Sequence, residues 1–382
     1  MSDRSDRFKD SIKFLSVCLT PVFLSLCILA VNLKDRAVQF QLACLVLLSI
    51  GAFFATIRFI PIVGPMCLKR GLGGKDINKG GDTPVPESLG IVSGTIYLVV
   101  IMMFQPILSS GLTEYNAALT GICFMMLLGF ADDVLDLRWS VKIGLSFLST
   151  LPLLVSYTGS TFIVVPVPLV PLIGHNVINL GLLYHVYIAF FSVFTTNSIN
   201  ILAGLNGLEA GQTIIITISM LIHGIIQYTM GIEPATNLAS ICMTVPFIAT
   251  TAALLYYNWY PSKCFVGDTF TYQAGMTLAV IGIMGHSTKT LMLFFIPQLI
   301  NFTISLPQLF GIIPCPRHRL PKLNRETGKL ECIKTNWNLI NLFLFILGPM
   351  SEKHLCSVVL WFQVFCNVMA FFIRYYVSTW VY

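Results

Sequence analysis

Three aspartates, Asp132, Asp133 and Asp136, lie within five positions at the end of the apolar run 117–129. If the stretch is helical, Asp132 and Asp136 are four residues apart and share a face. Their mutual repulsion and desolvation would cost on the order of several kcal/mol unless a cation lay among them. Because hard cations prefer oxygen ligands, the pattern predicts a Mg²⁺ site. The alternative is a solvated acidic loop at the end of a membrane span.

Neutral oxygen donors gather between residues 195 and 212. Asn197, Asn200 and Asn206 lie there among small residues, and the spacing would put Asn197 and Asn200 side by side on a helix. Amide oxygens can ligate Mg²⁺ and can contact the edge of a nucleotide base. Glycines such as Gly204 permit close approach of the backbone to a ligand. The alternative is that the amides cap the ends of spans.

Two further segments carry residues suited to a phosphorylated ligand with a flat ring. Asp268 is the only acidic residue of its segment and begins a span, where an unpaired carboxylate is costly unless it caps a helix or binds a cation. Phe265 nearby could stack on a ring or simply pack in the core. Arg317, His318 and Arg319 lie between prolines, and the planar fork of Arg suits phosphate oxygens. Ordinary basic charge on the cytosolic side is the alternative.

The first polar segment, residues 61–88, gives a weaker signal. It contains a glycine-rich run from Gly71 to Lys79, and it ends with Glu87 directly after Pro86. A carboxylate there suits a helix N-terminus, so we expect Glu87 to cap the next span. Taken together, the polar segments supply oxygen donors for Mg²⁺, basic groups for phosphates, and aromatic and amide groups for a base. Phosphoryl transfer requires such a set.

The composition indicates that membrane helices position these residues. Hydrophobic residues make up 55% of the 382 residues and charged residues only 10%, whereas a soluble domain is about a quarter charged. The net charge of +6 is spread over short polar segments, which argues against a nucleic-acid partner. The 11 cysteines form no C-x-x-C pair, so we expect small buried hydrophobes rather than zinc ligands or disulfides.

Apolar runs predict the transmembrane helices, although several are shorter than the usual ~20 residues. The runs are centred on residues 14–31, 38–60, 89–108, 117–130, 143–157, 181–194, 213–228, 238–256, 270–284, 290–312 and 355–379. The sequence therefore predicts an all-α polytopic membrane protein with about ten to eleven transmembrane helices and the active site in cytosolic loops. Residues 1–37 form an N-terminal extension with an additional apolar span, which we expect to be retained, and residues 38–382 form one membrane domain.

The distribution of positive charge predicts the orientation. A cytosolic N-terminus places on the cytosolic side the segments 1–13, 61–88, 131–142, 195–212, 257–269 and 313–354. These segments hold 18 of the 23 Lys and Arg residues, whereas 109–116, 158–180 and 229–237 on the other side hold none. Every segment with candidate chemistry then faces the cytosol. Transporters usually place such groups near the midplane, so the arrangement favours an enzyme that joins a soluble substrate to a lipid.

The polar segments resemble those of the polyprenyl-phosphate sugar-1-phosphate transferase superfamily. The resemblance rests on Ala-Asp-Asp-Val-Leu-Asp-Leu-Arg-Trp from Ala131, Asn-Ser-Ile-Asn-Ile-Leu-Ala-Gly-Leu-Asn-Gly-Leu-Glu from Asn197, Phe-Val-Gly-Asp-Thr from Phe265 and Pro-Cys-Pro-Arg-His-Arg from Pro314. The last motif is typical of the eukaryotic branch. The resemblance implies that N-acetylglucosamine (GlcNAc) 1-phosphate passes from UDP-GlcNAc to dolichyl phosphate, giving dolichyl-diphosphate-GlcNAc and UMP. It also implies Mg²⁺ dependence, a site on the cytosolic face of the endoplasmic reticulum membrane, and inhibition by tunicamycin.

The resemblance further implies roles for individual residues. Phe265 would stack on uracil and Asn206 would read it, while Lys142 would hold the lipid phosphate. The catalytic set would be Asp132, Asp133, Lys142 and His318. The ligands of Mg²⁺ would be Asn200 and Asp268. The substrate-binding set would be Ile77, Glu87, Trp139, Gly204, Asn206, Phe265, Arg317 and Arg319.

The expected partners are therefore UDP-GlcNAc, dolichyl phosphate and the lipid bilayer, with no nucleic acid; a homodimer is also compatible with the resemblance. One alternative is a related transferase that uses another UDP-sugar or polyprenyl phosphate. Another is a nucleotide-sugar transporter, which would need no Mg²⁺ and would release no UMP. For a transferase, direct attack by the lipid phosphate is favoured over a covalent intermediate on an aspartate, because a phosphate is already a nucleophile at neutral pH.

Overall fold

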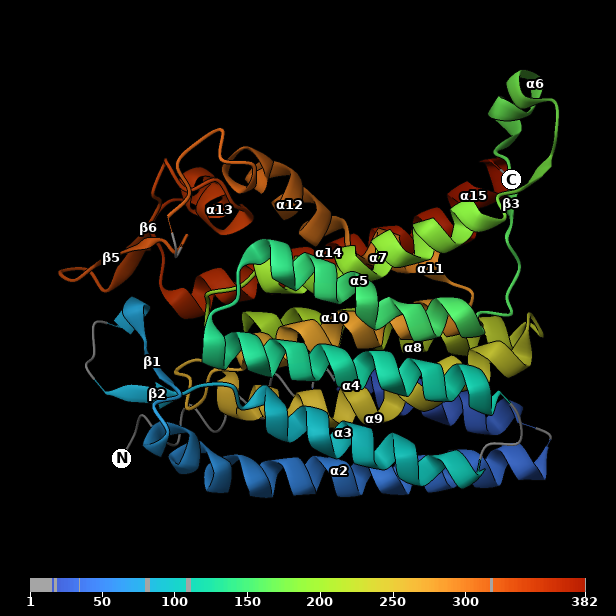
Figure 1. Cartoon of the computed structure of the whole chain (residues 1–382), viewed down its shortest axis with the longest axis horizontal. Helices are drawn as coiled ribbons and strands as arrows, with labels where there is room; N and C mark the ends of the chain where they lie inside the picture. Colours follow the sequence, from blue (N-terminus) through green and yellow to red (C-terminus); the bar gives the residue numbers. More distant parts are fainter. Residues whose placement is uncertain are drawn as a thin grey trace.

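Long helices packed side by side make up most of the structure (Figure 1). The computed structural model describes residues 16, 19–33, 35–79, 83–107, 111–316 and 319–381. Eight helices of this part are long and apolar enough to cross a membrane. They are α2 (Arg36–Lys69), α3 (Gly90–Phe104), α4 (Leu112–Leu135), α5 (Trp139–Ser156), α7 (Leu182–Ile201), α8 (Leu208–Thr229), α9 (Pro234–Asn258) and α14 (Glu352–Phe372).

Shorter helices complete the bundle. A helix over Leu19–Asn32 precedes α2, and its Val22 and Leu29 belong to the same hydrophobic core as the other helices. The bent pair α11 and α12, with an angle of 68° at the break, would make a ninth span. The remaining helices are α6 (Val170–Ile173), α10 (Gly267–Met284), α11 (Thr288–Phe294), α12 (Ile296–Leu309), α13 (Leu339–Leu347) and α15 (Ser378–Val381). Single turns are η1 (Ile77–Lys79), η2 (Gln105–Ile107) and η3 (Val167–Leu169), and η4 (Ile373–Val377) is a π-helical segment.

Each predicted apolar run coincides with one of these helices or with the bent pair, so the predicted all-α polytopic fold is confirmed. The strands of the described chain form three antiparallel hairpins. These are β1 (Gly73–Lys75) with β2 (Pro84–Pro86), β3 (Phe162–Val164) with β4 (Val177–Asn179), and β5 (Lys322–Asn324) with β6 (Lys329–Glu331). The first and third hairpins lie at one end of the bundle, and the second lies at the other (Figure 1). The charge pattern predicts the same two sides of the membrane for the segments that contain these hairpins.

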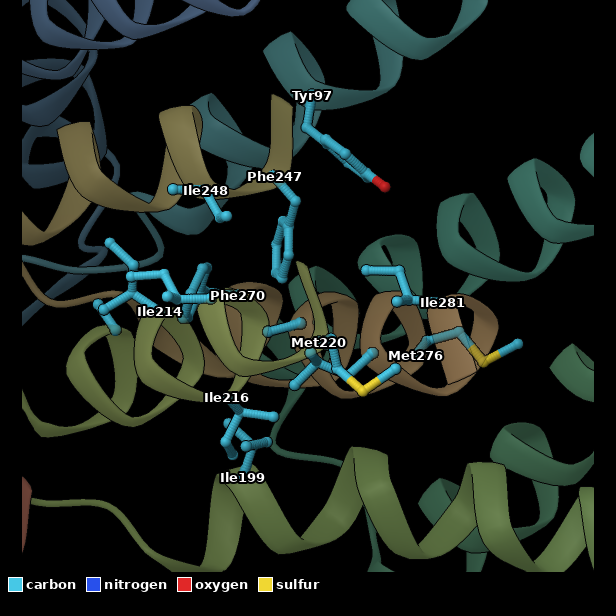
Figure 2. Packing of buried hydrophobic residues seen from close by; sticks show 14 of the residues in the cluster. Tyr97, Ile199, Ile214, Ile216, Met220, Phe247, Ile248, Phe270, Met276 and Ile281 are labelled. Atoms are coloured by element: carbon cyan, nitrogen blue, oxygen red, sulfur yellow. The ribbon is translucent and has the colours of Figure 1, made fainter. Parts of the chain in front are cut away.

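Helix α10 runs through the core of the bundle. Every residue from Thr269 to Met284 is buried, and its most extensive neighbours are α4 and α7. Figure 2 shows Phe270, Met276 and Ile281 of α10 among side chains from α3, α7, α8 and α9. Because neighbouring helices shield it from lipid, α10 can carry several polar side chains. Its buried residues accordingly include Thr269, Thr271 and Gln273.

Two close crossings bring α4 and α7 onto α10. A Cβ at Gly129 of α4 would lie 2.4 Å from the backbone oxygen of Asp268, and a Cβ at Gly275 of α10 would lie 2.3 Å from the Cα of Thr196 in α7. Only glycine fits at such distances. These contacts place the end of α4 beside the first turn of α10 and hold α7 alongside it.

Candidate active site

The polar residues singled out in the sequence meet where the ends of four helices converge. Asp132 lies in the last turn of α4, Lys142 in the first turn of α5, Asn200 at the end of α7 and Asp268 in the first turn of α10. Trp139 begins α5 and is 51% exposed. These residue positions come from distant parts of the chain, and the crossings around α10 bring them together.

The ammonium group of Lys142 lies between two carboxylates. Its Nζ is 2.6 Å from Asp132 Oδ2 and 4.0 Å from Asp268 Oδ2. Asp132 also accepts hydrogen bonds from the Leu137 backbone N–H (3.0 Å) and the Tyr272 hydroxyl (3.2 Å). The Asp132 side chain is 2% exposed, whereas that of Lys142 is 18% exposed. Lys142 therefore compensates a buried charge and remains accessible to an anionic ligand.

Asp133 points to a different partner, the N-terminus of α10. Its Oδ1 accepts a 2.7 Å hydrogen bond from the backbone N–H of Asp268. Its Oδ2 accepts from the backbone N–H (3.2 Å) and the hydroxyl (2.6 Å) of Thr269. The first amides of a helix have no partner within that helix, and a carboxylate there also interacts favourably with the helix dipole. Asp133 thus acts as a cap delivered by another helix, and it fixes the turn that carries Asp268.

Asn200 presents its amide group to the same turn. Its Nδ2 donates to Asp268 Oδ1 (2.6 Å) and to Thr271 Oγ1 (2.9 Å), which leaves Oδ1 as the ligating atom of the amide. An amide oxygen beside a carboxylate oxygen is a donor set that suits Mg²⁺, whose remaining ligands are usually waters and substrate phosphates. The end of α7 is held in turn by Gln212, whose Nε2 donates to the backbone oxygens of Ile199 and Leu202.

The predicted cation site among three aspartates is wrong. Asp132 and Asp133 turn to different partners, and Asp136 is an exposed C-cap residue with φ +50°, off the helix. Asp132 and Asp136 therefore do not share a helix face. In the described ranges, no group of three His, Cys, Asp or Glu side chains could hold a metal ion. A cation at this site would need mixed donors such as Asn200 and Asp268.

Phe265 and Glu87 come together over Gly74, at the side of the site formed by the first hairpin. A Cβ at Gly74 would lie 3.3 Å from the Phe265 ring and 3.5 Å from the Glu87 carboxylate. Burial, reinforced by the negative charge of Asp133, raises the pKa of the Glu87 carboxyl. Ile77 is 53% exposed in the turn η1 of the same segment. The structure thus brings together Phe265 and Glu87, two of the residues that the resemblance assigned to the nucleotide.

Glu87 does not cap α3, so that prediction is wrong. Helix α3 begins after Leu89, and no side-chain hydrogen bond caps it at that residue. Instead the amides of Leu89 and Gly90 donate to the backbone oxygens of Phe265 (3.1 Å) and Val266 (2.9 Å). The backbone that precedes α10 therefore satisfies the start of α3, and the Glu87 carboxylate is left to face Phe265.

Asn206 lies in a buried network between α7 and α8. Its Nδ2 donates to Glu352 Oε1 (2.7 Å) and to Asp76 Oδ2 (3.2 Å), and its Oδ1 accepts from the backbone N–H of Ser262 (2.7 Å). The residue is only 6% exposed. The network ties the α7–α8 turn to the first hairpin segment, to the loop before α10 and to α14.

The basic segment is described in part. Arg317 and His318 lie outside the described residues. Arg319 donates to a backbone oxygen 3.5 Å away, and burial lowers the pKa of its guanidinium group. Leu320 packs against Gly204, where a Cβ would lie 2.2 Å from the leucine side chain and where φ is +108°. The segment therefore reaches the α7–α8 turn beside the network of Asn206.

The structure differs from the sequence predictions in two ways. The segments expected to be loops are mostly helix ends, since 195–201 belong to α7 and 131–135 to α4. Sequence reasoning also missed Tyr272, Gln212 and Glu352. Tyr272 and Gln212 are buried polar residues within spans, a feature that marks functional positions in membrane proteins. Glu352 gave the weakest signal, a single acid at the start of an apolar run.

A helical membrane bundle with this cluster of acids, amides and a lysine at its helix ends defines a membrane-embedded glycosyl transferase. Residues 115–286 match the model of glycosyl transferase family 4. The UDP-N-acetylglucosamine–dolichyl-phosphate N-acetylglucosaminephosphotransferase of Dictyostelium discoideum is 46% identical over 96% of this chain and 96% of its own length. The enzymes of the same name from Schizosaccharomyces pombe (38%; 88% and 92% covered) and Saccharomyces cerevisiae (35%; 84% and 88%) are also similar. The chain belongs to this family of N-acetylglucosaminephosphotransferases.

Proposed function

We propose that the protein transfers GlcNAc 1-phosphate from UDP-GlcNAc to dolichyl phosphate, giving dolichyl-diphosphate-GlcNAc and UMP. The observation that carries the proposal is the convergence of Lys142, Asp132, Asn200 and Asp268 at one end of the bundle. An accessible lysine suits the phosphate of a lipid that arrives from the membrane. Amide and carboxylate oxygens suit the cation that accompanies a nucleotide diphosphate. The names of the three relatives support the same two substrates.

In the proposed step, an oxygen of dolichyl phosphate attacks the β-phosphorus of UDP-GlcNAc. The new phosphorus–oxygen bond forms as the bond from the β-phosphorus to the bridging oxygen breaks, and UMP leaves with that oxygen. Lys142 holds the attacking phosphate, and Asp132 fixes Lys142 at 2.6 Å. Asp133 keeps the first turn of α10 in register with Lys142 and Asp132. The catalytic contribution of the chain is therefore mainly positioning and charge compensation.

Asn200 and Asp268 would hold Mg²⁺ through the amide oxygen and a carboxylate oxygen. When bound there, the cation would neutralise charge that develops on the diphosphate. Arg317 and Arg319 would contact the diphosphate, and His318 would face the sugar. On the nucleotide side, the uracil ring would stack on Phe265 and meet Asn206, with Gly204, Glu87, Ile77 and Trp139 around it. The site would face the cytosol from the endoplasmic reticulum membrane, and tunicamycin would inhibit it.

The proposal is tested with purified protein in detergent, dolichyl phosphate, MgCl₂ and UDP-GlcNAc. We expect UMP and lipid-linked GlcNAc in equal amounts, and we expect EDTA to abolish both. Replacing the donor by UDP-GalNAc or UDP-glucose tests the choice of sugar. If folded protein that binds UDP-GlcNAc released neither product, the transferase function would be wrong. Uptake of labelled nucleotide sugar into sealed vesicles would then test the transporter alternative.

A further inference from the structure

Three buried glutamines form an amide network behind the end of α7, and the proposed reaction does not use it. Gln212 lies in α8, Gln298 in α12 and Gln363 in α14, and they are 1%, 0% and 2% exposed. Gln298 Nε2 donates to Gln212 Oε1 (2.8 Å) and to Gln363 Oε1 (2.7 Å). One amide group therefore joins three helices that are distant in the sequence.

Backbone oxygens fix the direction of each hydrogen bond in the amide network. At one end, Gln212 Nε2 donates to two backbone oxygens at the end of α7. At the other end, Gln363 Nε2 donates to the backbone oxygen of Phe294 at 2.8 Å. Because a carbonyl oxygen can only accept, both amides must turn their own oxygens toward Gln298. Gln298 therefore has to present its Nε2 group to both neighbours.

Gln212 holds the backbone on both sides of Asn200. Its Nε2 lies 3.2 Å from the backbone oxygen of Ile199 and 2.7 Å from that of Leu202. The last carbonyl groups of a helix have no partner within the helix, so this side chain supplies a donor where α7 ends. Asn200 lies between the two anchored positions, and its Nδ2 reaches Asp268 Oδ1 at 2.6 Å. The anchored backbone thus sets where the Asn200 amide lies relative to Asp268.

Stability alone does not account for the amide network. Among the described residues, the Oε1 of Gln298 has no hydrogen-bond partner. A buried acceptor without a donor lowers stability, and polar side chains within membrane spans are costly in general. Apolar residues at all three positions would avoid this cost. A polar network that is retained at such a cost is typical of functional positions in membrane proteins.

We propose that Gln212, held by Gln298, is a positioning residue that sets the metal affinity of the site by fixing the end of α7. The inference rests on the proposed function, in which an amide oxygen of Asn200 and a carboxylate oxygen of Asp268 hold Mg²⁺. Residues that orient metal ligands without touching the metal contribute about 10- to 100-fold to metal affinity. Without the Gln212 amide, the backbone that carries Asn200 can shift away from Asp268.

The test measures the Kd of Mn²⁺, a paramagnetic probe of Mg²⁺ sites, from the EPR signal of the free ion with purified protein and no nucleotide. Gln212→Leu removes the hydrogen bonds of the side chain with little change in its volume. We expect the Kd of Mn²⁺ to rise about tenfold. The Mg²⁺ concentration for half-maximal UMP release should rise as well. The KM for dolichyl phosphate should keep its parental value, since Lys142 of α5 holds the lipid phosphate.

Gln227→Leu is the matched control, because Gln227 is also a buried amide of α8. Its Nε2 donates to the Tyr375 hydroxyl at 3.2 Å. It lies about 22 Å further along the helix than Gln212. The same substitution there should leave the Kd of Mn²⁺ unchanged, even if it lowers the unfolding midpoint. An equal loss of metal affinity in both variants would reveal a general structural defect and overturn the inference.

Gln298→Met is a second variant, one helix further from the site, and it carries the test if Gln212→Leu does not fold. Methionine can fill the space but offers Gln212 no donor, so we expect a smaller loss of Mn²⁺ affinity in the same direction. A parental Kd in folded Gln212→Leu, or in Gln298→Met where it carries the test, would overturn the inference. A parent protein that makes UMP but binds no Mn²⁺ would refute both metal ligands and the inference with them. A parent protein that makes no UMP would instead refute the proposed function.

Discussion

Adjacent aspartates in α4 have different partners. Successive side chains on a helix point about 100° apart, which lets Asp132 and Asp133 reach different partners. Asp132 meets the ammonium group of Lys142, and Asp133 meets the first amides of α10. Asp268, although it is at the start of the capped helix, keeps its own carboxylate beside Asn200. The three acids should therefore give different phenotypes when they are replaced.

Asp133→Ala is expected to lower the free energy of unfolding by about 1–2 kcal/mol, the usual cost of losing a helix cap. Asp268→Ala is expected to abolish turnover with little loss of stability, because the carboxylate lies near two other acids. Thermal unfolding in detergent and UMP release from UDP-GlcNAc measure the two effects. Near-normal turnover in Asp268→Ala would refute its assignment as a metal ligand. An unchanged unfolding midpoint in Asp133→Ala would refute the cap.

Glu87→Gln is expected to raise thermal stability at neutral pH. Burial and the charge of Asp133 raise the pKa of Glu87 in the folded protein, so the folded state binds the proton more tightly than the unfolded chain does. The parent protein therefore loses stability as the pH rises through the raised pKa, and glutamine has no charge to desolvate. The advantage of Glu87→Gln should disappear as the pH falls below the ordinary value of 4.5.

The prediction is checked by measuring the unfolding midpoints of Glu87→Gln and of the parent protein without substrate, from neutral pH to below pH 4.5. The exposed Glu326→Gln should track the parent at every pH. A gain for Glu87→Gln that did not depend on pH would show that the carboxylate charge is not its cause.

At the scale of helices and strands, the sequence predicts the spans well and their contacts poorly. Backbone groups inside a bilayer must be paired within the segment, so an apolar run of sufficient length is a helix. This rule also placed Asp268 correctly at the start of a span. Hydropathy marks only where lipid begins, so it predicts loops where helix ends such as Asn197 to Ile201 lie. The cap from Asp133 to α10 spans 135 residues and the bond from Asn206 to Glu352 spans 146, distances over which no local pattern carries information.

Gly129→Ala is expected to reduce both stability and activity. The added Cβ would lie 2.4 Å from the backbone oxygen of Asp268, so α4 and α10 would have to separate. Overpacking of this kind costs about 1–3 kcal/mol. The separation would also displace Asp132 relative to Asp268, and we expect kcat to fall by at least about tenfold. Gly144→Ala in α5, where no atom lies within 4 Å, is the control and should keep parental kcat and stability. Equal behaviour of the two variants would show that the α4–α10 crossing does not limit the site.

At the scale of the whole molecule, the chemistry lies at one end of the bundle. The hairpins β1–β2 and β5–β6 lie at this end, and β3–β4 with α6 lies at the opposite end (Figure 1). A site at one membrane surface lets a soluble nucleotide sugar meet a lipid phosphate without crossing the bilayer. The excess of Lys and Arg in the segments of the same end predicts that this surface faces the cytosol.

This orientation predicts which thiols a membrane-impermeant maleimide reaches in sealed vesicles that contain the protein and whose cytosolic side faces outward. Cys315 is exposed in the basic segment, and His175 is exposed between α6 and β4 at the other end. We expect Cys315 to be modified without detergent, and a cysteine placed by His175→Cys to be modified only after detergent is added. Exposed Cys27 and Cys123 lie on apolar helices, where a membrane-impermeant reagent dissolved in water does not reach them.

Cys315→Ser removes the first signal and serves as its control. The same vesicles allow a second, independent measurement, because UDP-GlcNAc does not cross the membrane. If the site faces outward, intact vesicles should release UMP at the rate seen after detergent permeabilisation. Labelling of His175→Cys in intact vesicles, together with UMP release that required detergent, would place the site in the lumen. The positive-charge argument would then be wrong for this chain, whereas the geometry around Lys142 and Asp268 would stand, since it does not depend on the side of the membrane.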